Sequence, residues 1–118
     1  MKQYSKLSES ITKFYIAQLL LGLTELQMHK FIHRDLKLEN MMLDSNGYLK
    51  IIDFDTACRL NGTMADEVCG TEEYKAPEMF SSAGYDRGVD FWATGILIYE
   101  MLFGSTPFFH QDVQRIPE

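Results

Sequence analysis

Four polar side chains with different chemistry lie close together in the middle of the sequence: Asp35, Lys37, Asn40 and Asp53. The carboxylate of Asp53 and the amide oxygen of Asn40 are of the type that a hard cation such as Mg²⁺ prefers. Taken one at a time, these residues equally fit a solvated ion pair, a turn-forming asparagine and a strand-ending aspartate. The individual residues therefore do not decide the chemistry, and their order along the chain becomes the informative feature.

The order is specific because several short motifs follow one another along almost the whole chain. They are His33-Arg34-Asp35 with Lys37 and Asn40, then Asp53-Phe54, Gly70-Thr71, Ala76-Pro77-Glu78, and finally Asp90, Trp92 and Gly95. Together they resemble the HRDLxxxN, DFG and APE signature of the protein kinase family. The lysine two places after Asp35 is typical of the serine/threonine branch. The segments around Cys69–Glu78 and Val89–Gly95 are most similar to the cyclic-nucleotide-dependent and related AGC kinases.

The resemblance implies a role for each residue of the first cluster. Asp35 would accept the proton of the substrate hydroxyl, and Lys37 would neutralise the γ-phosphate of ATP. Asn40 and Asp53 would hold Mg²⁺ ions that bridge the phosphates. Lys37, Glu39, Asn40 and Asp53 are thus the residues expected to bind the cofactors, ATP and Mg²⁺.

The resemblance also predicts how the activation segment is held. In the family the residue at Arg34 receives the phosphate that orders this segment, and Glu67 occupies the position of the phosphorylated threonine. We hypothesise that Glu67 replaces that phosphate; the alternative is an ordinary solvated acidic loop. Thr71 resembles the threonine that hydrogen-bonds the catalytic Asp and Lys. Glu78 normally pairs with a downstream arginine, so here we expect a buried carboxylate without its cation.

Two departures from the kinase pattern bear on activity. Asp55 stands where the magnesium motif has glycine, and its charge either repels the phosphates or recruits a metal. The sequence also has no GxGxxG motif and no strand lysine before the first predicted helix. We therefore expect a fragment that lacks the nucleotide-clamping N-lobe and the last helices of the C-lobe, with apolar helix faces left exposed.

Two helices and a hairpin must position these residues. Apolar residues recur at helical spacing between Ser8 and about Lys30, and basic residues collect at the end of this stretch. The expected core stripe of this helix comprises Ile11, Phe14, Tyr15, Leu19, Leu23 and Leu26. A second helix is predicted from Asp86 or Asp90 to about Phe103, ended by Gly104, with the run from Phe91 to Phe103 buried.

Between the helices the sequence predicts irregular structure with one hairpin. Residues 33–40 have no regular periodicity and read as a loop. Met41–Leu43 and Tyr48–Ile52 are short strands joined at Asn46-Gly47, which would supply the positive backbone angles of a tight turn. The predicted fold class is mainly α with a small β-hairpin, a partial protein kinase domain over residues 1–118.

Composition excludes several classes of partner. The chain has 17 acidic against 11 basic residues, so no broad positive field attracts nucleic acid or an anionic membrane. The apolar runs are too short to span a bilayer. Cys58 and Cys69 form no disulfide framework or zinc motif, which favours the cytosol or nucleus. His29 and His33 lack a third metal ligand, so we expect His33 to be a packed core residue.

These observations predict a serine/threonine protein kinase that transfers the γ-phosphate of ATP to protein hydroxyl groups. A protein substrate and ATP are the implied partners, with a regulatory domain or subunit as a further one. Two alternatives stay open: a non-catalytic, pseudokinase-like binding module, which Asp55 and the missing lobe favour, and a truncated relic.

Overall fold

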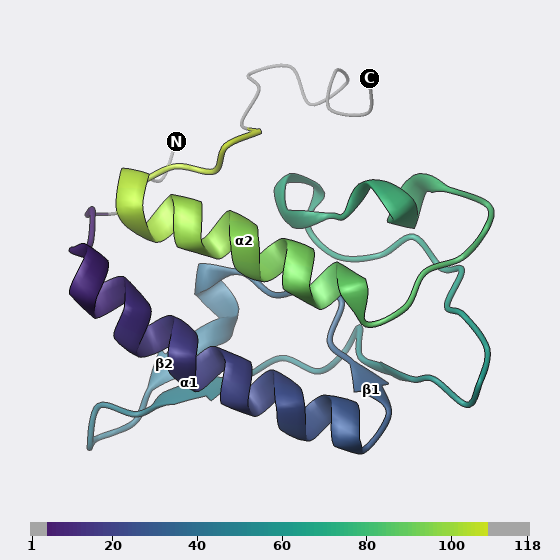
Figure 1. The fold of residues 1–118 in the computed structure, drawn as a ribbon, viewed down its shortest axis with the longest axis horizontal. Helices are drawn as coiled ribbons and strands as arrows, with labels where there is room; N and C mark the ends of the chain where they lie inside the picture. Colours follow the sequence, from purple (N-terminus) through teal and green to yellow (C-terminus); the bar gives the residue numbers. More distant parts are fainter. Residues whose placement is uncertain (1–4, 109–118) are drawn as a thin grey trace.

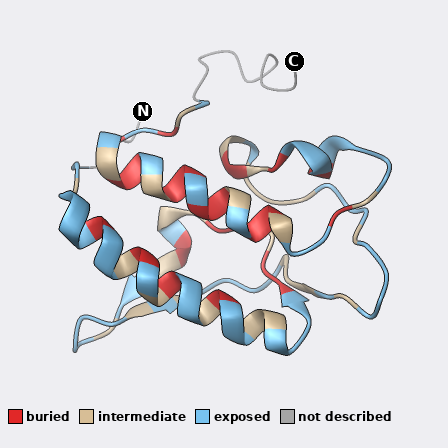
Figure 2. Cartoon of the chain, viewed as in Figure 1, coloured by how far each residue is buried: buried red, intermediate tan, exposed pale blue. Residues whose placement is uncertain are grey.

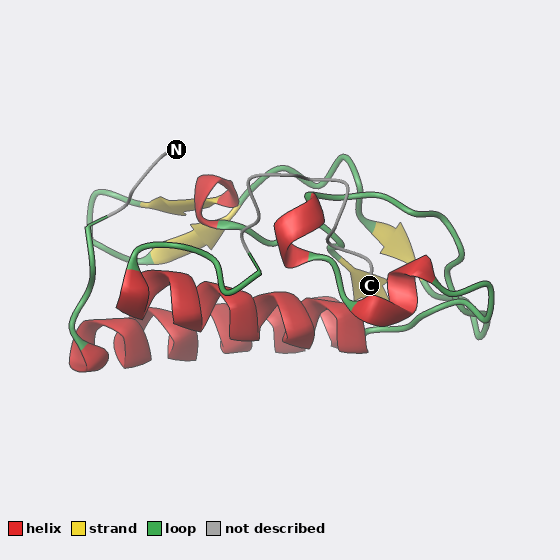
Figure 3. Ribbon diagram, turned by 90° about the horizontal axis from the view of Figure 1, so that it is seen from above, coloured by secondary structure: helices red, strands yellow, loops and turns green. Residues whose placement is uncertain are grey.

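The computed structural model describes residues 5–108, which form two layers. Helices α1 (Glu9–Met28) and α2 (Gly88–Phe103) run side by side in opposite directions and make one layer (Figure 1). The strands, the short 3₁₀ helices and the loops that connect them form the second layer (Figure 3). All the chemically interesting loops lie in this second layer, on a helical base.

Helix α1 begins where the sequence predicts but buries a different face. The Ser8 hydroxyl caps its first turn by accepting from the amide of Ile11, at 3.4 Å. The last turn contains no basic residue, because Lys30 lies beyond the helix end. The buried side chains are Thr12, Ile16, Leu19 and Leu23.

Two residues of the predicted core stripe are not in the core. Ile11 is 45% exposed and Phe14 is 57% exposed. The prediction was wrong here because α1 carries apolar residues on more than one side, and spacing alone does not show which side packs on α2. Phe14 instead makes an edge-on contact with the ring of Tyr15.

The predicted hairpin is present as strands β2 (Met41–Leu43) and β3 (Leu49–Ile51), paired antiparallel with Met41 opposite Ile51. Its turn is closed by the Asp44 carboxylate, which accepts from the amides of Asn46 and Tyr48 at 2.9 Å each. Only Gly47 of the Asn-Gly pair has a positive φ, of 83°. Asn46 was expected to share this conformation, and the Asp44 side chain makes that unnecessary.

A second small sheet was not anticipated. Strands β1 (Phe31–Ile32) and β4 (Cys58–Arg59) pair antiparallel and bring the two ends of the region 31–59 together. Short 3₁₀ helices η1 (Leu38–Asn40), η2 (Glu72–Tyr74) and η3 (Pro77–Phe80) interrupt the loops. Residues 53–84 are otherwise irregular, as predicted.

Helix α2 has one buried and one exposed side (Figure 2). Its N-cap residue is Arg87, and the carboxylate of the preceding Asp86 accepts from the Gly88 amide at 2.8 Å; the helix ends at Gly104 with φ of 81°. Phe91, Tyr99 and Phe103 are between 40% and 52% exposed. The prediction that the whole run from Phe91 to Phe103 is buried was therefore wrong. The prediction that apolar helix faces are left exposed is confirmed for α2.

Two buried clusters support the loops between them. One lies between the helices and includes Leu19, Leu23, Leu36 and Leu97. The other joins β1 to the activation segment and α2 through Ile32, Ala76, Met79, Tyr85 and Val89. Residues 33–35 lie between Ile32 in one cluster and Leu36 in the other, which fixes both ends of this short segment.

Candidate active site

The Asp35 carboxylate is the centre of a hydrogen-bonded group contributed by two distant segments. Its Oδ1 accepts from the Thr71 hydroxyl at 2.7 Å and from the Thr71 amide at 2.9 Å. Lys37 Nζ lies 3.0 Å from Asp35 Oδ2 and donates to Thr71 Oγ1 at 2.8 Å. The three predicted residues therefore meet in space although 36 positions separate the first from the last.

This environment keeps Asp35 ionised. Partial burial by itself would raise the pKa of the Asp35 carboxyl, but the hydrogen bonds from Thr71 and the charge of Lys37 outweigh burial and lower it below its ordinary value. Asn40 adds a bond from its amide nitrogen to the backbone oxygen of Asp35, at 2.8 Å. The result is a fixed, charged carboxylate whose side chain is only 11% exposed.

Asp90 of α2 holds the backbone that carries Asp35. Its carboxylate accepts from the amides of His33 at 2.8 Å and Arg34 at 2.9 Å. Burial raises the pKa of Asp90, while these two donors act in the opposite direction. The sequence placed Asp90 in the motif series and as a possible start of the second helix, but did not predict that it accepts from these two amides. The position of Asp90 in the motif series was the feature of the sequence that could have indicated a structural role at the site.

His33 is fully buried, as predicted for a packed structural residue. Its Nε2 lies 3.1 Å from the backbone oxygen of Ile52, and the ring of Phe54 packs edge-on at 5.0 Å between centroids. His33 thus connects the loop of Asp35 to the segment of Asp53. Within the described residues, no group of three or more His, Cys, Asp and Glu side chains is arranged to hold a metal.

Arg34 connects the loop of Asp35 to the activation segment. Its guanidinium donates to the Thr56 backbone oxygen, to the Tyr85 hydroxyl at 3.1 Å and to Glu67 Oε2 at 3.1 Å. The Arg34 side chain is 7% exposed, whereas that of Glu67 is 70% exposed. The Tyr85 hydroxyl also donates to the backbone oxygen of Glu67. Tyr85 and Thr56 were not predicted as participants, since neither belongs to a motif with known chemistry.

Gly70 allows the close approach of the two segments. Its φ is 85°, and a Cβ atom built at this position would lie far inside van der Waals contact with the backbone oxygen of Arg34. Only glycine combines this backbone angle with such a contact. Gly70 therefore places Thr71 against Asp35.

Asp53 is presented differently from Asp35. It follows β3 with a strained φ of 62°, and its carboxylate is exposed. The Asp53 Oδ1 accepts only a long bond of 3.4 Å from the Asp55 amide among the contacts found in residues 5–108. The backbone of Asn40 accepts from Ile52 at 2.9 Å, so Asn40 and Asp53 lie on adjoining segments. Both keep a side-chain oxygen for a cation, and Mg²⁺ commonly uses one or two protein ligands together with phosphates.

Comparison with known proteins now decides the family, because the sequence matches the protein kinase domain over residues 1–118. The chain belongs to the protein kinase family. It is 39% identical over 118 residues to the cAMP-dependent protein kinase catalytic subunit of Schizosaccharomyces pombe, covering 100% of this chain and 23% of the relative. It is 44% identical over 116 residues to the cAMP-dependent protein kinase catalytic subunit of Dictyostelium discoideum, covering 98% and 18%.

A third relative, cAMP-dependent protein kinase type 3 of Saccharomyces cerevisiae, is 40% identical over 118 residues, which are 100% of this chain and 29% of the relative. These matches confirm the predicted similarity to the cyclic-nucleotide-dependent group of serine/threonine kinases. The chain spans between 18% and 29% of the length of these three kinases. Within residues 5–108, neither helix is both long and apolar enough to cross a membrane.

Two predicted features of this kinase chain look different in the structure. Glu78 is exposed rather than buried, so the expected cost of an unpaired buried carboxylate does not arise in residues 5–108. Asp55 is also exposed, and it does not have the positive φ for which glycine would be needed. The strained position of this motif is Asp53 instead. Glu39 lies exposed in η1, between Lys37 and Asn40 in sequence.

Proposed function

We propose that this chain is the C-lobe part of a serine/threonine protein kinase domain, formed by residues 1–118, and that it aligns a substrate hydroxyl for phosphoryl transfer. The observation that carries the proposal is the bridge of Thr71 between Asp35 and Lys37, with all three heteroatom distances between 2.7 and 3.0 Å. Phosphoryl transfer needs mainly alignment and charge neutralisation, and this group supplies both.

In the proposed mechanism Asp35 orients the serine or threonine hydroxyl of a protein substrate and accepts its proton. Its low pKa suits a group that must be ionised before the substrate arrives. Lys37, held by Asp35 and Thr71, faces the transferred phosphoryl group and offsets its charge. Thr71 holds the side chains of Asp35 and Lys37 in position, and the activation segment binds the protein substrate.

The oxygens of Asn40 and Asp53 would hold Mg²⁺, with Lys37 and Glu39 on the nucleotide side. Bound Mg²⁺·ATP supplies the phosphoryl group and neutralises charge on its phosphates. The donor set fits because an amide oxygen and a carboxylate are hard ligands on adjoining segments. Asp55 adds a second exposed carboxylate beside Asp53, and we expect it to weaken phosphate binding by repulsion unless it is itself neutralised by a cation.

The ion pair between Arg34 and Glu67 supports a segment that is ordered without phosphorylation. A carboxylate carries less charge and fewer acceptor oxygens than a phosphate. Here Tyr85 compensates by bonding both Arg34 and the Glu67 backbone. We propose Arg34, Glu67 and Thr71 as the residues that hold the activation segment, with Glu78 at its end. A cytosolic or nuclear protein with a protein substrate and a regulatory domain or subunit fits this assignment.

The test is transfer of labelled γ-phosphate from Mg²⁺·ATP to a serine peptide by the protein that carries this chain. The Asp35→Asn variant should lose about 10²- to 10⁴-fold in rate, the range that a general base contributes. Asp44→Asn, which changes a half-buried aspartate in the hairpin turn and keeps a side-chain oxygen there, is the matched control and should retain its rate. Equal activity of Asp35→Asn and wild type would remove the proposal.

A second candidate is a non-catalytic, kinase-like binding module, which the exposed apolar side chains on α1 and α2 favour. Thermal unfolding of the protein that carries this chain, with and without Mg²⁺·ATP, distinguishes the two candidate functions. A rise in melting temperature with Mg²⁺·ATP supports the kinase. No rise with nucleotide, and no phosphate transfer by the protein that carries the chain, supports the binding module.

A further inference from the structure

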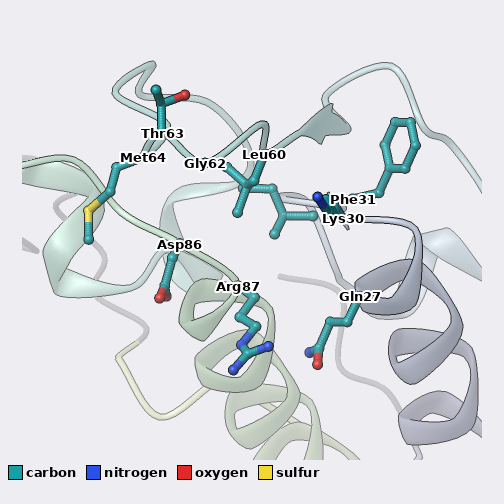
Figure 4. Close-up of a pocket in the computed structure, with 10 residues that line it drawn as sticks. Gln27, Lys30, Phe31, Leu60, Gly62, Thr63, Met64, Asp86 and Arg87 are labelled. Carbon is teal, nitrogen blue, oxygen red and sulfur yellow. The ribbon is translucent and has the colours of Figure 1, made fainter.

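A pocket lies where the end of α1, strand β1, the segment 60–64 and the start of α2 meet (Figure 4). Its volume is about 410 Å³. The apolar part of its wall comes from Phe31, Ile32, Leu60 and Met64. None of the residues that line it is a side chain placed at the phosphoryl-transfer site, so the pocket is a separate feature.

Two cations at this pocket lack an anionic partner. Lys30 and Arg87 line it from opposite elements, and neither side chain makes a hydrogen bond or ion pair with the rest of the described chain. The one acidic residue of the lining, Asp86, already directs its carboxylate to the Gly88 amide at 2.8 Å. The pocket is thus locally positive in a chain whose net charge is −6.

A third group at the pocket also lacks an acceptor. The side-chain nitrogen of Gln27 is buried without a hydrogen-bond partner. Figure 4 shows the side chains of Gln27 and Arg87 pointing toward one another from the two helices. Both ends present N–H groups, and two donors that face each other are satisfied by an acceptor placed between them.

We propose that this pocket docks an acidic peptide segment of a protein partner, with one carboxylate side chain between Arg87 and Gln27, in the pocket that Lys30 also lines, and a neighbouring apolar side chain on Leu60 and Met64. The mixture of apolar wall and few charges suits a peptide better than a nucleic acid or a free phosphate. Nucleic acid would need a wider positive surface, and free phosphate would gain nothing from the apolar wall.

Docking at this place would act on the activation segment. Leu60 and Met64 precede Glu67 on the same irregular stretch, and Ala65 bonds to Tyr85 through two backbone hydrogen bonds of 2.8 and 2.9 Å. Tyr85 in turn contacts Arg34 and Glu67. A peptide that fixes residues 60–64 therefore stabilises the arrangement next to the catalytic loop. The binding itself is independent of the proposed phosphoryl transfer.

The experiment measures binding to the full 118-residue chain by fluorescence anisotropy, without ATP. The probe is a labelled peptide of sequence Ala-Leu-Glu-Leu-Ala, compared with versions in which the glutamate is replaced by glutamine or lysine. We expect the glutamate peptide to bind best. Arg87→Ala should weaken it about tenfold and Lys30→Ala about threefold, because each removes a charged hydrogen-bond donor. Arg59→Ala, an exposed arginine outside the pocket, is the matched control and should bind as wild type.

Charge reversal keeps the test decisive. Arg87→Glu should lose the glutamate peptide and gain affinity for the lysine peptide, and its circular dichroism should match that of wild type because Arg87 is exposed. The proposal is overturned if the glutamine peptide binds as tightly as the glutamate peptide. It is also overturned if Arg59→Ala weakens binding as much as Arg87→Ala.

Discussion

The loop of Asp35 and the segment of Asp53 both contribute to the candidate site, but the protein holds them in different ways. The Asp35 carboxylate receives bonds from Thr71 and contacts Lys37. Its backbone oxygen accepts from Asn40, and the amides of the two preceding residues are bonded to Asp90. The Asp53 carboxylate is exposed and is contacted by one amide at 3.4 Å. One half of the site is therefore built by the chain itself, whereas the other half presents oxygen atoms to solvent.

The difference matches the chemistry proposed for each half. A hydroxyl must be aligned within a fraction of an ångström, which favours a carboxylate fixed by several bonds before the substrate arrives. A metal ligand gains its order from the cation, so a carboxylate with few protein contacts suits that role. Variants that disturb the contacts of Asp35 should consequently lose more stability or activity than comparable changes at residues that do not contact this carboxylate.

The largest effect should come from Gly70→Ala. The added Cβ would collide with the Arg34 backbone oxygen at a φ that disfavours any side chain. We expect a loss of about 3 kcal/mol in the free energy of unfolding, measured by urea denaturation, because strain and steric overlap both contribute. Thr71 should also separate from Asp35.

Gly62→Ala is the matched control for this change. Gly62 has a similar φ of 84°, but a Cβ there meets nothing within 4 Å. Its cost should be only the conformational part, about 1 kcal/mol. If both variants lose the same stability, the close approach of Gly70 to Arg34 does not hold the segment.

A smaller effect should appear in the pH dependence of stability. The pKa of Asp35 is lowered in the folded chain, so the unfolded chain binds the proton more readily. The stabilisation from ionised Asp35 is therefore present above its unfolded pKa, near 4, and is lost as pH falls through the lower folded value. Urea midpoints between pH 5 and pH 2.5 should fall less steeply in Asp35→Asn than in wild type. Parallel curves would show that Thr71 and Lys37 do not stabilise the charged carboxylate.

The smallest effect should come from Glu67→Ala. Because Glu67 is 70% exposed, water and salt screen its ion pair with Arg34. We expect the rate of phosphate transfer to fall about two- to fivefold, and Arg34 to remain attached through Thr56 and Tyr85. Asp66→Ala, the neighbouring acidic residue, should leave the rate unchanged. An unaltered rate in Glu67→Ala would support the alternative of a solvated acidic loop.

The sequence predicted the elements whose signals are local. The start of α1 next to Ser8, the hairpin over residues 41–51 and the end of α2 at Gly104 depend on neighbouring residues, and the structure has all three. The motif order also anticipated that Asp35, Lys37 and Thr71 would meet. This expectation came from the family pattern, since no local rule links residues so far apart.

The remaining features depend on tertiary packing and were missed or misjudged. Pairing of β1 with β4 joins two-residue strands that have no periodicity of their own. The exposure of Ile11 and Phe14 follows from which side of α1 faces α2. The role of Asp90 as an acceptor for the His33 and Arg34 amides needs a three-dimensional position that composition and spacing do not give.

Amide hydrogen exchange on the 118-residue chain, without nucleotide or metal, tests the contrast between the two halves most directly. The amides of Arg34 and Thr71 are bonded to the carboxylates of Asp90 and Asp35 at 2.9 Å each, whereas the Asp55 amide has only its long bond to Asp53. We predict that the Arg34 and Thr71 amides exchange slowly and the Asp55 amide exchanges fast. Equally fast exchange at all three amides would contradict the claim that the contacts around Asp35 are formed before substrate, nucleotide or metal binds.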